Sequence, residues 1–164
     1  MLKYYWAQCS GYDPVVSEYM YSIKDEFLNL TQWIYIINES LVCSHAGLTN
    51  YFIDKCYKSI ERITGENNPT LDKINLLQPS ELFGFTPDNL YDRYGNSRTQ
   101  PCTWIRPHAL IDDLPPFSQI IGHTPVSSIY GISISDSSKV WLCDALGIKQ
   151  YLTIIDSKIN INVL

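Results

Sequence analysis

From residue 117 onward the sequence breaks into short apolar runs, each ended by turn residues, and this spacing constrains the fold strongly. Runs of about five residues between turn signals are typical of short β-strands. The segment from Ile129 to Ser135 also alternates partly between apolar and small or polar residues, as a half-buried antiparallel strand does. Strands are therefore predicted over residues 117–122, 129–135, 139–143, 150–155 and 158–163.

The earlier part of the chain reads as helices around one hairpin. Apolar residues at steps of three and four predict a helix over residues 15–30. Apolar runs at 33–37 and 41–43 flank the turn Asn38-Glu39-Ser40, which predicts a hairpin. Further helices are predicted from Asn50 to about Ile63 with Gly65 closing it, from Pro69 to Leu77 and from Pro107 to Asp113, with a long loop over residues 79–101.

Helices that come between early and late strands predict a mixed α/β fold of the α+β type, with late strands largely antiparallel. A chain of 164 residues with 45% hydrophobic and 18% charged residues is long enough and apolar enough for one globular domain over residues 1–164. The net charge of −5 disfavours nucleic-acid binding, which needs a basic surface. Scattered Lys and Arg residues and the absence of a long apolar run give no sign of membrane binding.

The chain has five cysteines, an odd number, and no Cys-x-x-Cys spacing. Neither a disulfide framework nor a zinc knuckle is indicated, and we expect a cytoplasmic location. Cys43 and Cys143 lie in apolar runs, where a free cysteine usually packs as a small hydrophobic residue.

His45 and His123 are the first candidates for chemistry, because each follows a short apolar run and precedes or follows a glycine in a turn. Strand ends with small neighbours can aim an imidazole at a metal or a substrate. A lone histidine at such a place more often packs and forms a hydrogen bond than binds a metal. His108 is expected at the surface, and Asp144 either supports a ligand histidine or caps a turn. Loop residues with an even chance of lining a pocket or lying on plain surface are Tyr91, Asp92, Tyr94 and Arg98.

Three segments in order carry a family resemblance: Ser44-His45-Ala46-Gly47-Leu48, Thr103-Trp104-Ile105-Arg106-Pro107 and Gly122-His123-Thr124-Pro125. Together they resemble the calcineurin-like metallophosphoesterases, particularly bacterial members of the serine/threonine-phosphatase type, over most of residues 33–156. The resemblance implies that His45 and His123 bind a metal ion and that Arg106 holds the substrate phosphate.

The resemblance also implies a fold and a reaction. The fold would be the C-terminal part of a four-layer αββα sandwich. The complete domain would use two divalent metal ions (Mn, Fe or Zn) to hydrolyse the phosphoester of a phosphorylated protein or small molecule. His45 and His123 should then converge, since two nitrogens about 2 Å from one ion lie at most roughly 4 Å apart.

Three motifs of that family are absent from the sequence, namely Asp-x-His, Gly-Asp-x-x-Asp and Gly-Asn-His-Asp/Glu. The chain is therefore expected to be the C-terminal part of the domain, with an incomplete catalytic set, weak metal binding and little activity by itself. Self-association through exposed apolar surface is also expected. Two alternatives stay open: a non-catalytic remnant that acts as an interaction module, and a subunit completed by another chain.

Overall fold

The computed structural model describes residues 14–78, 92, 94–135, 138–156 and 158–164. The chain divides into two compact units, residues 1–32 and 33–164. The interpretation of residues 1–164 as a single partial domain stays a prediction.

In the first unit, α1 (Pro14–Ser22) and α2 (Lys24–Leu30) take the place of the single helix predicted over residues 15–30. Ile23 separates them, because its φ of −108° and ψ of 15° lie outside α-helical values. The prediction of an uninterrupted helix was therefore wrong at this residue. Apolar spacing continues across the interruption and so could not reveal it.

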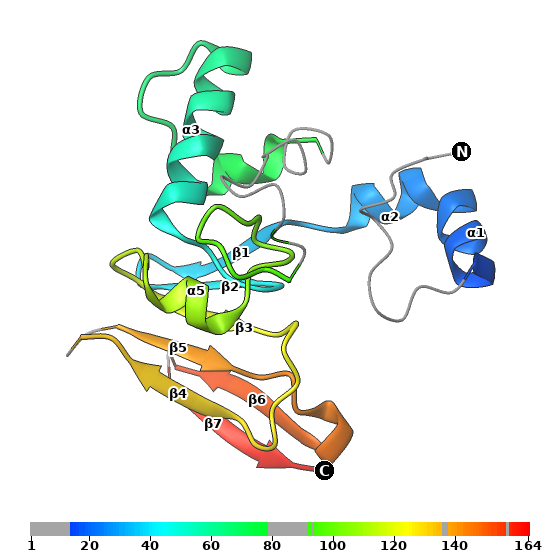
Figure 1. The fold of residues 1–164 in the computed structure, drawn as a ribbon, viewed down its shortest axis with the longest axis vertical. Coiled ribbons are helices and arrows are strands. Elements are labelled where there is room, and N and C mark those ends of the chain that lie inside the picture. Colours follow the sequence, from blue (N-terminus) through cyan, green and yellow to red (C-terminus); the bar gives the residue numbers. More distant parts are fainter. Residues whose placement is uncertain (1–13, 79–91, 93, 136–137, 157) are drawn as a thin grey trace. The chain divides into compact units, whose positions relative to one another are not determined.

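The second unit contains a five-stranded mixed sheet and a separate two-stranded sheet (Figure 1). The order in the larger sheet is β1-β2-β3-β5-β4. Its strands are β1 (Ile34–Asn38), β2 (Leu41–Ser44), β3 (Ser118–Ile121), β4 (Tyr130–Ser133) and β5 (Lys139–Leu142), and the smaller sheet consists of β6 (Gln150–Ile155) and β7 (Lys158–Val163). A mixed α/β fold with strands in all the predicted runs is thus confirmed.

Strand directions differ in part from the expectation. The β4–β5 and β6–β7 pairs are antiparallel as predicted, but β3 runs parallel to both β2 and β5. Parallel neighbours need a long crossover, and the chain between β2 and β3 supplies one that contains helices. The short apolar runs predict the strands but carry no information on which partner each strand meets, and Leu41 of β2 pairs with Ser118 of β3 far along the chain.

Helices of the second unit begin and end close to the predicted positions. In α3 (Asn50–Thr64) the N-cap is Thr49, whose hydroxyl accepts from the Phe52 N–H, and Gly65 closes the helix in the left-handed conformation. The expected helix from Pro69 is instead the 3₁₀ helix η2 (Leu71–Leu76), because Thr70 is still extended. The last of the predicted helices, α5 (Pro107–Ile111), stops two residues before Asp113.

One face of the larger sheet carries the core. The strand register puts Val42, Gln119 and Val140 in one row across β2, β3 and β5. Beneath α3, Phe52 and Ile60 pack with Ile34 and Val42. Beneath α5, a second cluster joins that helix to β3 and β5, with Leu110, Ile121, Val140 and Leu142 as members. Burying each such side chain stabilises the fold by about 1.5–3 kcal/mol.

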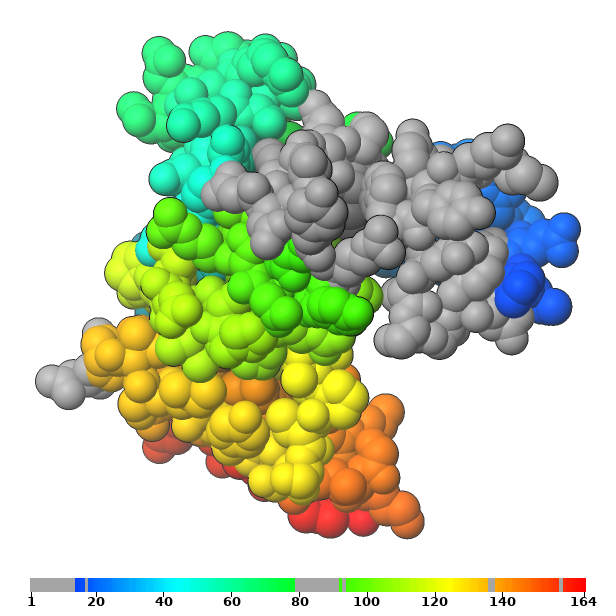
Figure 2. Space-filling model, in the orientation of Figure 1, coloured from blue at the N-terminus to red at the C-terminus, as the bar shows by residue number. Residues whose placement is uncertain are grey.

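The β6–β7 hairpin is tied to the rest of the unit by its first residue, since the Ile129 N–H donates to the Gln150 side chain at 2.8 Å. Ile161 and Val163 lie on one face of the hairpin and are 46% and 70% exposed. In Figure 2 this part of the chain is coloured orange to red and forms one end of the second unit, with α3 at the other end. None of the helices among the described residues has the length and apolar character that a membrane crossing requires.

Candidate functional site

Two parallel strands deliver the two candidate histidines to the same edge of the sheet. Ser44, the last residue of β2, is in register with Ile121, the last residue of β3. His45 follows the first strand directly, and Gly122-His123 follow the second. The Gly122 N–H donates to the His45 carbonyl at 2.9 Å, which joins the two strand exits. In open sheets, ligands bind at the carboxyl ends of parallel strands, and both histidines lie at such an end.

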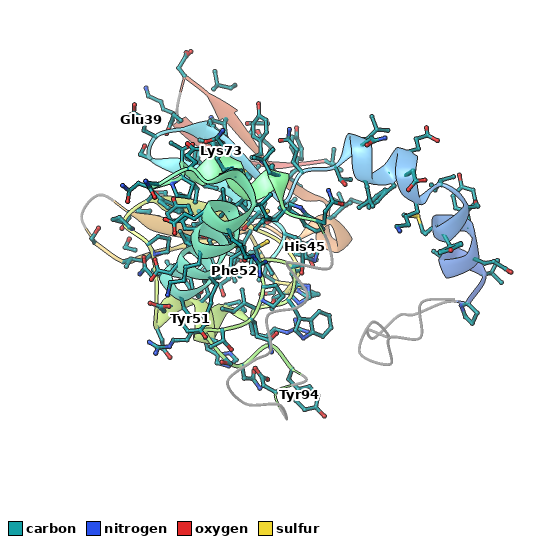
Figure 3. The ribbon with its side chains drawn as sticks, turned by 90° about the horizontal axis from the view of Figure 1, so that it is seen from above. Glu39, His45, Tyr51, Phe52, Lys73 and Tyr94 are labelled. Carbon is teal, nitrogen blue, oxygen red and sulfur yellow. The ribbon has the colours of Figure 1, made fainter. Side chains whose placement is uncertain are left out.

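The two imidazoles meet across a sequence separation of 78 residues. His45 Nε2 and His123 Nδ1 are 3.0 Å apart, and the ring centroids are separated by 4.9 Å with the planes at 62°. His45, labelled in Figure 3, is exposed, whereas His123 is half-buried. The predicted convergence of His45 and His123 is confirmed, although their role as metal ligands stays a prediction.

An unusual backbone conformation aims His123 at its partner. Its φ is +62°, in the left-handed region that residues with a Cβ adopt at a cost. The turn is tight, because the Thr124 N–H donates to the Gly122 carbonyl at 2.7 Å. Strained residues of this kind are concentrated at functional sites.

His123 is held in its neutral form. Burial, the Arg106 charge and His45 lower the pKa of His123 to about 4, while Asp144 and the backbone of Trp104 act weakly in the opposite direction. The Nε2 atom of His123 is buried and makes no hydrogen bond within the described part of the chain. A neutral imidazole is the form that binds metal ions.

Arg106 and Trp104 form the adjoining part of the site. The Arg106 guanidinium donates from Nη1 to the Thr124 hydroxyl at 3.2 Å and from Nε to the Tyr94 carbonyl at 3.3 Å. It also lies 5.7 Å from the Trp104 ring, and the same ring is 5.1 Å from His123. A planar cation is thereby fixed beside the histidine pair, where it could hold a phosphate through two parallel N–H groups.

Gly95 shapes the loop that supports Arg106. Its carbonyl accepts from the Arg106 N–H at 2.8 Å, and its φ is +80°. A Cβ at this position would collide with the Trp104 carbonyl, so only glycine fits.

The histidine pair fits one half of a metal site. Two nitrogens about 2.05 Å from one ion and at right angles to each other are about 2.9 Å apart, close to the 3.0 Å between His45 Nε2 and His123 Nδ1. Within the described residues no third His, Cys, Asp or Glu joins them in a group that could hold a metal. Asp144 affects His123 through its charge, but is not part of such a group.

The remaining sequence candidates have other positions. His108 is exposed on α5. Asp92 organises its loop by accepting hydrogen bonds from the Gln100 side chain and from the Asn96 and Tyr94 backbones. Burial raises the pKa of the Asp92 carboxyl, but these hydrogen bonds outweigh burial, and the net pKa is lowered. The Tyr94 ring is 72% exposed and projects outward in Figure 3, so only its carbonyl serves the site. The Arg98 guanidinium lies over Tyr51, and Tyr91 is outside the described residues.

No protein-family model, no curated protein and no solved structure matches this chain. Both histidines and Arg106 are candidates in the sequence, and the structure brings these three residues together. The contacts that Trp104 and Thr124 make with these residues were not predicted, because they depend on which side chains meet when the chain folds.

Proposed function

We propose that this chain provides one metal-binding half and the phosphate-binding residue of a calcineurin-like metallophosphoesterase site. The single observation that carries the proposal is the 3.0 Å approach of His45 Nε2 to His123 Nδ1. Support comes from Arg106, which is fixed next to the pair through Thr124. The finer fold that we propose is the C-terminal part of a four-layer αββα sandwich.

Each residue has a distinct task in this proposal. His45 and His123 present neutral nitrogens to one divalent ion (Mn, Fe or Zn). Arg106 binds and orients two oxygens of a phosphoester, and the Trp104 ring keeps the guanidinium in place. When bound, a pair of divalent ions supplies Lewis-acid stabilisation and an activated water for phosphoester hydrolysis. The substrate would be a phosphorylated protein or small molecule.

The reaction also needs carboxylate ligands, which the described residues do not bring to this site. We therefore propose that these 164 residues have little or no phosphatase activity by themselves and that the remaining ligands come from another segment or chain. The same observation favours the alternative, a non-catalytic remnant that acts as an interaction module and keeps the pair only as part of its scaffold.

Calorimetric titration with Mn²⁺ or Zn²⁺ tests the metal role. We expect one weak site, with a Kd above about 1 µM, because two neutral ligands leave the ion under-coordinated. His45→Ala and His123→Asn should each abolish it, and His108→Ala, at an exposed position, is the matched control. Binding that survives both substitutions would overturn the proposal, and sub-micromolar binding would show that further ligands exist.

Binding of inorganic phosphate in the presence of the metal tests the role of Arg106. Arg106→Lys keeps the charge but loses the paired N–H groups, so affinity should fall nearly as far as in Arg106→Ala. Arg98→Lys is the control, because the Arg98 guanidinium lies over Tyr51 and not at the histidine pair. Equal phosphate affinity in Arg106→Ala and the unmodified chain would exclude Arg106 as the phosphate ligand.

A further inference from the structure

Gln119 is a fully buried polar residue in the middle of the sheet. It lies on β3 between Val42 of β2 and Val140 of β5, and its side chain is 0% exposed. An apolar residue would suit this row better, since burying an amide without partners costs about 1–3 kcal/mol. A carboxamide here needs a specific partner.

That partner is the backbone of one residue in the loop that follows β2. The Leu48 N–H donates to Gln119 Oε1 at 2.8 Å, and Gln119 Nε2 donates to the Leu48 carbonyl at 2.9 Å. The carboxamide thus makes the two bonds that a neighbouring strand would make. Leu48 is itself fully buried, so these bonds also satisfy a buried backbone donor and acceptor.

Leu48, whose N–H and carbonyl are both clamped by the Gln119 carboxamide, lies three positions after His45. The His45 carbonyl is also held, since it accepts from the Gly122 N–H at 2.9 Å. Residues of β3 and its exit therefore hold the His45 loop at two points, Gln119 and Gly122, and the next residue is His123 itself. One strand thereby holds the His45 loop and carries His123, so a change in the clamp should alter the distance between the two imidazoles.

We propose that Gln119 is a positioning residue that sets the approach of His45 to His123 by clamping Leu48. The geometric part of this inference concerns the metal-free chain, and its importance for metal binding rests on the proposed function. Elsewhere the chain uses a similar device: Asn75 Oδ1 accepts from the Ile34 N–H at 3.1 Å and Asn75 Nδ2 donates to the Ile34 carbonyl at 3.0 Å. Asn75 is thus a control for the loss of a buried carboxamide, because it clamps Ile34 on β1, the register partner of Ser44, and not the loop that follows β2.

The first test uses NMR of the metal-free chain labelled with ¹⁵N at histidine. The unmodified chain should show imidazole shifts of two fixed neutral tautomers that share a hydrogen bond. Gln119→Met, which keeps the volume and removes both bonds, should give averaged tautomer shifts for His45 and His123. Asn75→Leu, also destabilising, should leave those shifts unchanged.

The second test measures Zn²⁺ affinity in the same variants. Residues that orient ligands usually contribute about 10- to 100-fold to metal affinity, so Gln119→Met should weaken binding by about tenfold or more and Asn75→Leu should not. If the unmodified chain binds no Zn²⁺, the proposed function fails while the NMR test of the clamp still decides the inference.

A third measurement uses only the unmodified chain, so it tests the inference even if the Gln119→Met chain does not fold. In the unmodified chain, the Leu48 amide should exchange with deuterium as slowly as the amides of β2 and β3, because its acceptor is a buried side chain. Fast exchange at Leu48 would overturn the inference, as would a folded Gln119→Met chain with unchanged imidazole shifts.

Discussion

The Trp104 ring lies 5.1 Å from the His123 ring at an angle of 54°, and the Arg106 guanidinium lies 5.7 Å from the same indole. One aromatic side chain therefore lies close to both a neutral base and a permanent cation. Burial of His123 and, after it, the Arg106 charge lower the pKa of His123, so the protonation of this imidazole is linked to the stability of the fold.

Stability should fall as the pH is lowered from about 6.5 to about 4. The surroundings lower the pKa of His123 to about 4 in the folded chain, whereas an unfolded histidine titrates near about 6.5. Between these values the unfolded state binds more protons, so acid favours unfolding, and the effect is complete below about pH 4. Urea unfolding at a series of pH values measures it.

The control for this pH dependence is His123→Asn, which tolerates the left-handed backbone. Its stability should decrease less than that of the unmodified chain over the same interval. His108→Asn, at an exposed position, should behave like the unmodified chain. An identical pH profile in His123→Asn would contradict the assignment.

Gly95→Ala should destabilise the chain and weaken phosphate binding together. A left-handed alanine costs about 1–3 kcal/mol, and its Cβ would also collide with the Trp104 carbonyl. Thermal melts and phosphate titration measure the two effects. Gly65→Ala is a matched control, because Gly65 is also left-handed (φ +71°) with no atom near its would-be Cβ. It should lose stability but not phosphate affinity.

Two cysteines should resist alkylation until the chain unfolds. Cys56 and Cys102 are 0% exposed, and burial raises the pKa of the Cys102 thiol to about 12 and that of Cys56 even further. Neither provides the thiolate that reacts with iodoacetamide. Mass spectrometry of the native chain should find both unmodified at neutral pH, and both alkylated in denaturant. Rapid native labelling at Cys102 would show that the packing beneath α3 is open.

Self-association should decrease when a charge is placed on the apolar face of the β6–β7 hairpin. Val163 is 70% exposed next to Ile161 on that face, and exposed apolar patches promote association. Val163→Lys should lower the apparent mass in sedimentation and reduce dye binding. Asn160→Lys adds the same charge on the opposite face of the hairpin and is the control. A monomeric unmodified chain with a cooperative melt and no dye binding would refute the prediction.

Local pattern was sufficient to predict the strands, the β1–β2 hairpin and the Gly65 helix end, because each depends on residues close in sequence. The convergence of His45 and His123 was expected from the family resemblance and not from spacing. Parallel pairing of β3 and the Gln119 clamp were missed, since both depend on contacts made across about 70 residues. The interruption at Ile23 was missed because it does not disturb the apolar spacing.

His123 has a φ of +62°, a conformation in which glycine or asparagine is the more favourable residue. The chain should therefore become more stable when this position loses its imidazole. If variants were selected only for folding, for example by their resistance to protease, His123 should be replaced by glycine or asparagine while the turn is retained. Such an experiment would enrich well-folded chains without the His45–His123 pair, and so would separate what the protein needs in order to fold from what it needs in order to bind.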